Sequence, residues 1–331
     1  MSLRTVPFGT TGMDITRVGF GAWAIGGGEW AYGWGTQDDR ASIDAIRRAI
    51  EAGVNWIDTA AVYGLGHSEE LVARAVKPYG EADRPYVFTK CGLVWDRADR
   101  GVEPRRSGHA ASIRREVEGS LRRLRTERID LYQMHWPAPE PIEEYWEVLA
   151  QLKAAGKVRA IGLSNHDTKQ LERAERIAPV DALQPPYSLI NRDAAAELDW
   201  CHSNGTGVIV YSPMQSGLLS GAFTAERAAT LPFDDWRSGS ADFLGRNLMR
   251  NLALVDALRP IANRHRTSVA SIAIAWCLSR PGVTAAIVGA RHPRQVDGWI
   301  SAPDVDLDAT DLIEIADALR RTGAGHGEIR P

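Results

Sequence analysis

Cysteine is scarce in this sequence, and its few cysteines lie far apart. The 331 residues include three, Cys91, Cys201 and Cys277, with no Cys-x-x-Cys pair and no histidine cluster beside them. This spacing argues against a disulfide framework and a structural zinc site, so we expect reduced thiols and no bound metal. Cys91 follows Lys90 directly. Because neighbouring residues on a strand point to opposite faces, a packing role is favoured for Cys91 over a reactive thiolate.

Long apolar runs and an excess of one charge are also absent. No segment approaches the ~18 apolar residues of a membrane-spanning helix, and the first residues lack the apolar core of a signal peptide. The formal net charge is only -3, which gives no electrostatic case for binding nucleic acid or an anionic membrane. The arginine-rich stretch 114–128 carries interspersed glutamates and leucines and predicts an amphipathic outer helix. We therefore expect a cytoplasmic protein without nucleic-acid or membrane partners.

What the chain does contain is a repeated pattern of short apolar, β-branched segments with helical periodicity between them. Such periodicity occurs, for example, within 43–50, 146–152 and 269–278. Alternating strands and helices predict an α/β fold, a (β/α)8 TIM barrel whose functional face is formed by the loops after the strands. Barrels of this length are commonly single domains, so we expect one domain over residues 1–331. The eight predicted strands are 18–23, 54–57, 86–89, 129–134, 158–163, 182–184, 207–211 and 284–288.

Three segments fall outside this repeat. The residues up to Arg17 are expected to form an N-terminal β-hairpin that turns within 9–12 and plugs the bottom of the barrel. Residues 212–246 are rich in glycine and lack a clear pattern, which predicts a long functional loop. A helix is expected over about 310–321. The Gly-rich tail 322–331 is expected to be mobile.

Four polar side chains follow or end three successive predicted strands: Asp58, Tyr63, Lys90 and His135. Because the carboxyl ends of barrel strands share one mouth, we expect these side chains to converge there. Taken singly, each is more often a packing or solvated residue. Gathered together, they form a set that can protonate a carbonyl oxygen.

Tyr63 is the candidate proton donor to a carbonyl that accepts hydride at carbon. A free phenol has a pKa of about 10 and is a weak acid at neutral pH. We expect the Lys90 ammonium to lower the pKa of Tyr63 and Asp58 to keep Lys90 charged and oriented. His135 is expected to hydrogen-bond to the carbonyl oxygen and fix its direction.

The sequence resembles the aldo-keto reductase family, in the bacterial branch similar to inositol-operon and general-stress reductases and to potassium-channel β subunits. The resemblance extends from Gly19-Phe-Gly-Ala-Trp23 to Val288-Gly-Ala-Arg291, nearly the whole chain. It implies that the four polar residues are a catalytic tetrad. It also implies a barrel that binds NADPH without a Rossmann domain and reversibly reduces an aldehyde or ketone to an alcohol.

The resemblance further implies which residues bind the coenzyme. Ser164, Asn165 and Gln184 match ligands of the nicotinamide carboxamide, and Tyr211 matches the aromatic ring that stacks on the nicotinamide. The loop after Tyr211 matches the segment over the pyrophosphate. The implied coenzyme-binding residues are Gly21, Ala22, Trp23, Asp58, Ser164, Asn165, Gln184, Tyr211, Ser212, Pro213, Met214, Ser216, Gly217, Arg237, Gly289, Ala290, Arg291 and Gln295.

Arg291 is the residue on which coenzyme preference depends most. Its guanidinium can pair with a 2′-phosphate, and the helix start that follows it favours anions. Many relatives have Gly-Lys and Glu-Asn where this chain has Gly221-Ala222 and Gly298-Trp299. These replacements remove polar contacts around the adenosine, so we expect Arg291, with Arg237, to bind the phosphate. We expect NADPH or NADP+ in preference to NADH.

Aromatic residues near the predicted mouth are candidates for the substrate pocket. We expect Trp23, Trp30, Tyr32, Trp34 and Trp95 to form its walls, although Trp34 and Trp95 could equally pack beneath a loop. The predicted substrate-binding residues are Trp23, Tyr63, Trp95 and His135.

A Rossmann motif is not supported. Residues 19–24 satisfy the loose Gly-x-Gly-x-x-Ala pattern, but a Gly-rich turn follows instead of the helix that the motif requires.

Two other classes of function remain open at the level of sequence. The first is a regulatory or binding protein, similar to channel β subunits, that senses the nicotinamide redox state and turns over slowly. The second is a lyase or isomerase on the same barrel, because barrels host many chemistries. The expected partner is a small carbonyl compound or alcohol. Monomer and homo-oligomer are equally compatible with the sequence.

Overall fold

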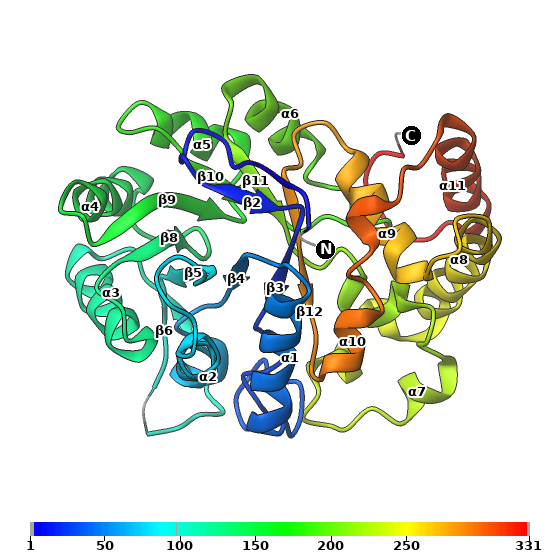
Figure 1. Ribbon diagram of the computed structural model, residues 1–331, viewed down its shortest axis with the longest axis horizontal. Coiled ribbons are helices and arrows are strands. Elements are labelled where there is room, and N and C mark those ends of the chain that lie inside the picture. Colours follow the sequence, from blue (N-terminus) through cyan, green and yellow to red (C-terminus); the bar gives the residue numbers. More distant parts are fainter. Residues whose placement is uncertain (1–2, 97, 330–331) are drawn as a thin grey trace.

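Eight parallel strands close into a barrel, which confirms the predicted (β/α)8 fold. The computed structural model describes residues 3–96 and 98–329. Each barrel strand pairs with the next one along the chain, and the last pairs back with the first. Figure 1 shows the helices outside this ring of strands. The strands are β3 (Val18–Gly21), β4 (Trp56–Asp58), β5 (Tyr86–Cys91), β8 (Ile129–Met134), β9 (Val158–Ser164), β10 (Ala182–Gln184), β11 (Gly207–Val210) and β12 (Ala285–Gly289).

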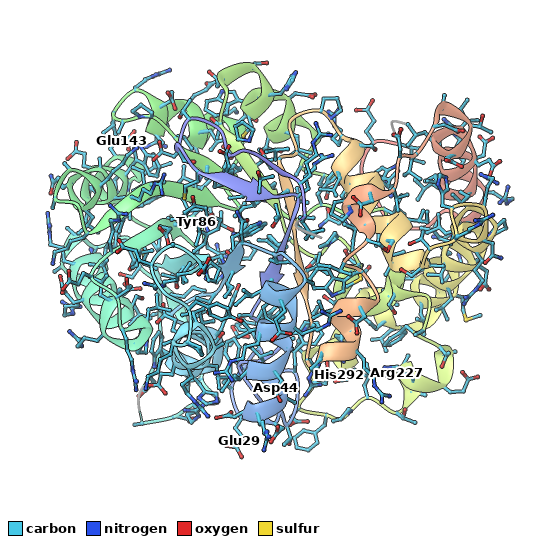
Figure 2. The ribbon with its side chains drawn as sticks, viewed as in Figure 1. Glu29, Asp44, Tyr86, Glu143, Arg227 and His292 are labelled. Carbon is cyan, nitrogen blue, oxygen red and sulfur yellow. The ribbon has the colours of Figure 1, made fainter. Side chains whose placement is uncertain are left out.

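The helices are built from the predicted periodic segments and bury their apolar faces against the strands. In α1, Ile43 and Ile46 are buried, whereas Asp44 lies on the exposed outer face (Figure 2). A capping box stands at the start of α5, where Asp167 and Gln170 each accept the backbone N–H of the other. The helices are α1 (Asp39–Glu51), α2 (His67–Val76), α3 (Ala110–Leu124), α4 (Ile142–Ala154), α5 (Thr168–Glu175), α6 (Ala195–Asn204), α7 (Ala225–Ala229), α8 (Gly245–Arg264), α9 (Val269–Ser279), α10 (Pro293–Asp297) and α11 (Ala309–Thr322).

A hairpin closes the bottom of the barrel, as predicted. Strands β1 (Thr5–Pro7) and β2 (Asp14–Thr16) pair antiparallel. Phe8 and Ile15 are 0% exposed and pack in one cluster with residues that point into the barrel, among them Trp56. The Trp56 indole N–H also donates to the carbonyl of Thr16 at 2.8 Å. The amino ends of the strands are therefore covered, and the functional face is at the opposite end.

Gly19 makes room for the Trp56 side chain inside the barrel. A Cβ at position 19 would lie 2.1 Å from Cε2 of Trp56, which is itself 0% exposed. A larger residue would displace the indole. The first glycine of the Gly-x-Gly pattern therefore serves barrel packing, in agreement with the rejection of a Rossmann motif.

The segment 212–246, expected to be irregular, contains several short helices. These are the 3-10 helices η2 (Gln215–Ser220), η3 (Trp236–Gly239) and η4 (Ala241–Phe243), together with α7, and α8 already begins at Gly245. Short helices of one turn carry too little periodicity to be recognised in the sequence.

The end of the described chain is held in place, which differs from the expected mobile tail. His326 donates its backbone N–H to Ile190 at 2.8 Å and accepts the backbone N–H of Arg192 at 3.1 Å. Gly325 permits this approach, since a Cβ there would lie 2.1 Å from the carbonyl oxygen of Ile190. Residues 330–331 of the predicted tail lie outside the described residues. None of the helices within 3–96 and 98–329 is both long and apolar enough to cross a membrane.

Candidate active site

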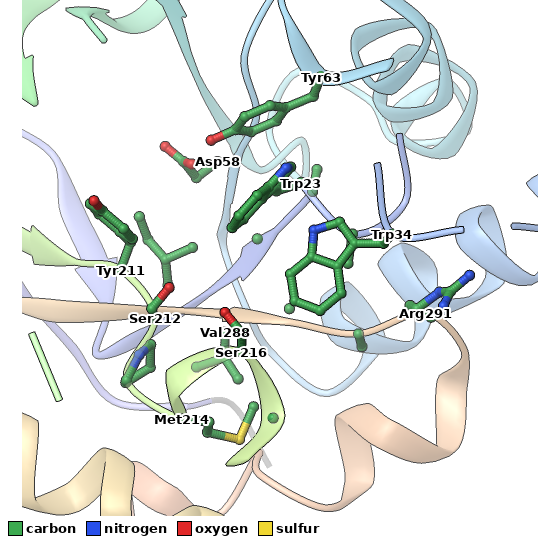
Figure 3. A pocket seen from close by; sticks show the side chains of 18 of the residues that line it. Trp23, Trp34, Asp58, Tyr63, Tyr211, Ser212, Met214, Ser216, Val288 and Arg291 are labelled. Carbon is green, nitrogen blue, oxygen red and sulfur yellow. The ribbon is translucent and has the colours of Figure 1, made fainter. Parts of the chain in front are cut away.

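A cavity of about 790 Å³ opens at the carboxyl ends of the barrel strands. Every residue predicted to bind the coenzyme lines it, together with Tyr63 and His135. In Figure 3, Asp58 and Tyr63 lie toward one side of the cavity and Arg291 toward another, with Trp23 and Trp34 between them. The volume is within the range of roughly 300–1,000 Å³ typical of small-molecule and cofactor sites.

The four candidate catalytic residues converge on the inner side of this cavity. Asp58 ends β4, Lys90 lies within β5, His135 follows β8, and Tyr63 begins the 3-10 helix η1 (Tyr63–Gly66). Nζ of Lys90 donates to Oδ2 of Asp58 at 2.6 Å and approaches the Tyr63 hydroxyl at 3.4 Å. The rings of Tyr63 and His135 meet edge to face, with centroids 5.6 Å apart. The predicted convergence therefore holds in the structure.

Lys90 is directed inward by strand alternation and is fixed by three oxygen atoms. Besides Asp58 and Tyr63, the ammonium donates to the carbonyl of Thr59 at 2.9 Å. The other oxygen of Asp58 accepts the side-chain amide of Gln184 at 2.8 Å. Burial raises the pKa of Asp58 and lowers the pKa of Lys90, while their contact opposes both shifts. The position of the Lys90 ammonium beside the Tyr63 hydroxyl is thus fixed by contacts with protein groups.

The pKa of Tyr63 shifts in the direction opposite to the sequence-based expectation. Burial raises it well above its ordinary value, and the negative charge of Asp58 adds to the rise. Lys90 does not produce the expected lowering, because its charge is directed at Asp58, which lies closer to Nζ than the phenol does. Tyr63 is therefore a neutral phenol at physiological pH.

His135 is also neutral and is held by backbone contacts. Burial, followed by the positive charge of Lys90, lowers the pKa of His135 well below its usual value. Its backbone N–H donates to the carbonyl of Cys91 at 3.0 Å, and its own carbonyl accepts the amide of Asn165 at 2.9 Å. A neutral imidazole at this position can donate one N–H bond without bringing a second positive charge into the cavity.

A hydrogen-bonded network joins the residues predicted to bind the nicotinamide. The Tyr211 hydroxyl donates to Oδ1 of Asn165 at 2.8 Å, and the Ser164 hydroxyl donates to the carbonyl of Gln184 at 2.8 Å. Asn165 and Ser212 adopt φ angles of 62° and 56°, which non-glycine residues rarely do. Strained backbone of this kind is typical of binding sites, where the surrounding structure fixes it.

Arg291 extends along the other part of the cavity and has only neutral hydrogen-bond partners among the described residues. Its Nε donates to Oε1 of Gln37 at 2.7 Å, and its backbone N–H donates to Oε1 of Gln295 at 2.7 Å. Arg227, on α7, also lines the cavity, and its charge acts on Arg291. Figure 2 labels Arg227 near His292, the residue after Arg291. These two arginines leave positive charge available to an anion.

Arg237, by contrast, is already neutralised. Its guanidinium makes two hydrogen bonds to Asp235, at 2.9 and 2.6 Å, and a third to the carbonyl of Ser216 at 3.2 Å. It also lies over the Trp34 ring, 4.6 Å from the centroid. Arg237 therefore connects η3 to η2 above the cavity and has less capacity for a phosphate than the sequence suggested.

Most of the predicted aromatic walls line the cavity, but Trp95 does not. Trp95 packs against the buried cluster that contains Trp30 and Val62. Strand β6 (Leu93–Val94) ends before it, so the alternation that turns Leu93 toward the cavity does not extend to Trp95. The prediction of Trp95 as a substrate-binding residue is therefore not supported.

Sequence reasoning missed several lining residues. Trp136 directly follows His135, and this adjacency alone could have identified it. Trp236, which does not itself line the cavity, stacks from the long segment after β11 on the lining residue Trp23, with ring centroids 5.3 Å apart. Arg106, Phe223 and Arg227 had no sequence pattern of their own. They are brought to the cavity by short elements that periodicity does not reveal.

The cysteines are packing residues. Cys91, Cys201 and Cys277 are buried, and burial raises the pKa of Cys91 well above its usual value. This agrees with the expected reduced thiols and with a structural role for Cys91.

Comparison with known sequences matches residues 17–320 to the family described as the Aldo/keto reductase family. Aldo-keto reductase YhdN of Bacillus subtilis (strain 168) is 38% identical over 315 residues, covering 94% of this chain and 92% of that protein. The NADH-specific methylglyoxal reductase of Escherichia coli (strain K12) is 35% identical over 335 residues, covering 96% of this chain and 100% of that protein.

Solved structures share the whole barrel. The glycerol dehydrogenase AKR11B4 from Gluconobacter oxydans has a TM-score of 0.88 and 36% identity, covering 100% of this chain and 99% of that chain. The aldo-keto reductase AKR11C1 from Bacillus halodurans has a TM-score of 0.79 at 24% identity, covering 99% and 100%, and this likeness concerns the fold alone.

Proposed function

The chain belongs to the aldo/keto reductase family, whose members are oxidoreductases that reduce carbonyl groups with a nicotinamide coenzyme, and we propose that it uses NADPH and Tyr63 to convert an aldehyde or ketone to an alcohol. The observation that carries this proposal is the convergence of Tyr63 and His135 on one cavity wall, with the buried Lys90 ammonium 3.4 Å behind the Tyr63 hydroxyl. The reaction is reversible, since the same residues can return the proton.

Tyr63 acts as the general acid. The raised pKa keeps its hydroxyl protonated at neutral pH, so a proton is available when negative charge develops on the carbonyl oxygen. The phenolate that remains after this transfer is buried, and Lys90 at 3.4 Å is the cation that stabilises it. Asp58 holds Lys90 in position and prevents the ammonium from losing its proton inside the barrel.

His135 orients the substrate. A neutral imidazole 9% exposed at the cavity wall can donate an N–H to the carbonyl oxygen that Tyr63 protonates. Two donors converging on one oxygen fix its direction and leave the carbonyl carbon facing the rest of the cavity. Trp23, whose ring lies 6.3 Å from that of Tyr63, limits the access of water to this point.

The cavity fits a nicotinamide dinucleotide in size and in the distribution of its donors. When bound, the reduced coenzyme supplies the hydride. Ser164, Asn165 and Gln184 would hold its carboxamide and Tyr211 its ring, at the end of the cavity nearest Tyr63. Arg291 and Arg227 would bind its phosphate groups.

Within residues 3–96 and 98–329, Arg291 and Arg227 form no ion pair with a carboxylate, and this supports a preference for NADPH. A 2′-phosphate carries additional negative charge, which favours a site whose guanidinium groups are not already paired with carboxylates. A relative named as NADH-specific shows that this preference must be measured for each chain.

The test is the oxidation of NADPH and of NADH, followed by absorbance, with a panel of aliphatic, aromatic and sugar aldehydes and ketones. We expect turnover with several of them and a lower KM for NADPH. Tight coenzyme binding without turnover of any carbonyl would instead favour a redox-sensing role. Absence of binding of either coenzyme would contradict the proposal.

A further inference from the structure

Arg106 lines the substrate side of the cavity but has no role in the mechanism above. It lies on β7 (Arg105–Arg106), which pairs antiparallel with β6, and Arg106 is the register partner of Leu93. Both Leu93 and Arg106 line the cavity, whereas their neighbours Val94 and Arg105 do not. Strand alternation explains this difference, because it turns one residue of each pair inward.

An aromatic ring positions the Arg106 guanidinium. Its Cζ lies 4.8 Å from the ring centroid of Trp136, the residue that follows His135. Within residues 3–96 and 98–329, Arg106 forms no ion pair with a carboxylate. The nearby Glu103 accepts the hydroxyl of Tyr32. A guanidinium stacked on an indole keeps the N–H groups at its edge free for a planar acceptor.

The charges that line the cavity fall into two groups. Arg227 and Arg237 both act electrostatically on Arg291, at the end expected to hold the coenzyme phosphates. Among the described lining residues the only carboxylate is Asp58, and Lys90 neutralises it. Arg106 is therefore the cation left to the substrate side, beside His135 and the tryptophans.

We propose that the substrate is a carbonyl compound that carries an anionic group, a carboxylate or a phosphate, and that Arg106 binds this group. The inference rests on the proposed reductase function and adds the substrate class. The carbonyl lies at Tyr63 and His135, the body of the substrate contacts Trp23 and Trp30, and the anion meets the edge of the guanidinium. A carboxylate suits this edge because two parallel N–H bonds can form.

The experiment compares two isosteric substrates, para-carboxybenzaldehyde and its neutral amide, para-carbamoylbenzaldehyde. We expect the wild-type protein to have at least a ~10-fold higher kcat/KM for the carboxylate, as a charged hydrogen bond typically provides. Arg106→Gln should reduce this ratio by roughly 10- to 100-fold, mainly through KM. Higher salt should reduce it as well. Glyceraldehyde and glyceraldehyde phosphate form a second pair that shows which anion is preferred.

Arg105→Gln is the matched control, because it removes the same charge from the same hairpin but from a side chain that does not line the cavity. It should leave the ratio within about 2-fold of wild type. An equal loss for both substrates in Arg106→Gln, or no preference in the wild type, would overturn the inference. Either of these overturning results requires that the neutral amide be reduced. Failure of the proposed reductase function would instead appear as no turnover of either substrate, so the two failures can be told apart.

Discussion

Lys90 and Asp58 form an ion pair inside the barrel, with Nζ and Oδ2 2.6 Å apart and side chains 0% and 4% exposed. A pair so deeply buried is sensitive to the loss of one partner. The attraction compensates the cost of desolvating both charges only while both are present.

We therefore predict that Lys90→Met is strongly destabilising as well as inactive. The substitution leaves the Asp58 carboxylate buried without its cation, which should cost about 3–5 kcal/mol of unfolding free energy. Urea denaturation measures this cost. Lys157→Met is the control, since the pair of Lys157 and Glu118 is 42% and 44% exposed and should contribute less than about 1 kcal/mol. Equal costs for the two variants would show that burial does not govern the pair.

Tyr63→Phe should separate chemistry from binding. Loss of the hydroxyl removes the general acid, so kcat should fall by about 10²- to 10⁴-fold. The coenzyme Kd, from quenching of protein fluorescence, should change little because the ring remains. Tyr86→Phe, near the hairpin at the closed end of the barrel, loses the same hydroxyl and should retain full activity. A Tyr63→Phe variant with near wild-type turnover would exclude Tyr63 as the proton donor.

His166 should make the stability of the fold depend on pH. Burial lowers its pKa from 6.5 to about 4, and its ring bridges the Tyr145 hydroxyl at 2.9 Å and the carbonyl of Ser164 at 2.8 Å. Below pH 6.5, His166 binds a proton in the unfolded chain, whereas in the folded chain it does so only near pH 4. The contribution of neutral His166 to the unfolding free energy is therefore complete above pH 6.5 and is lost as the pH falls toward about 4. The shift corresponds to about 3 kcal/mol.

The measurement is urea unfolding between about pH 4 and pH 7 for wild type and His166→Gln. The gap between the two unfolding free energies should narrow by about 3 kcal/mol as the pH falls. The acidic residues titrate alike in both proteins and cancel in this difference. His202→Gln, which removes an exposed imidazole, is the control for the substitution itself. If the unfolding free energy of His166→Gln ran parallel to that of wild type over this pH range, His166 would not be the source of the pH dependence.

Arg291 should set the coenzyme preference. Arg291→Ala is expected to weaken NADPH binding by roughly 10- to 100-fold, the usual worth of a charged hydrogen bond, and to weaken NADH binding far less. Titration of both coenzymes measures the two Kd values. Arg294→Ala removes an exposed charge from α10, the helix that begins two residues after Arg291, outside the cavity, and should affect neither Kd strongly. Equal weakening of NADPH and NADH would assign Arg291 to a part of the site that both share.

The barrel could be predicted from sequence because each strand and helix has its own periodicity. The convergence of Asp58, Tyr63, Lys90 and His135 could be predicted because they end or follow successive strands. Properties that depend on burial and tertiary contacts, such as pKa shifts and ion pairs, could not be predicted from the sequence. The pKa of Tyr63 rises because the phenol is enclosed and Asp58 is near. Arg237 pairs with Asp235 because a 3-10 turn brings two residues so close in sequence to face each other.

Short elements account for the other omissions. Arg106 reaches the cavity on a strand of two residues, too short to show alternation. Trp95 lies one residue beyond the partner strand, packs against the cluster of Trp30 and Val62, and is not among the residues that line the cavity. Aromatic and arginine side chains on such loops acquire their roles only from tertiary packing.

The hairpin beneath the barrel places residues that matter for thermal stability at the opposite end of the molecule from the reactive groups. Phe8 and Ile15 pack against the amino ends of the barrel strands and do not line the cavity. Trimming either side chain should lower the melting temperature and leave kinetic constants at low temperature untouched. The hairpin end of the barrel could thus be stabilised against heat, and the loops around the cavity changed for new substrates, with little effect of one change on the other.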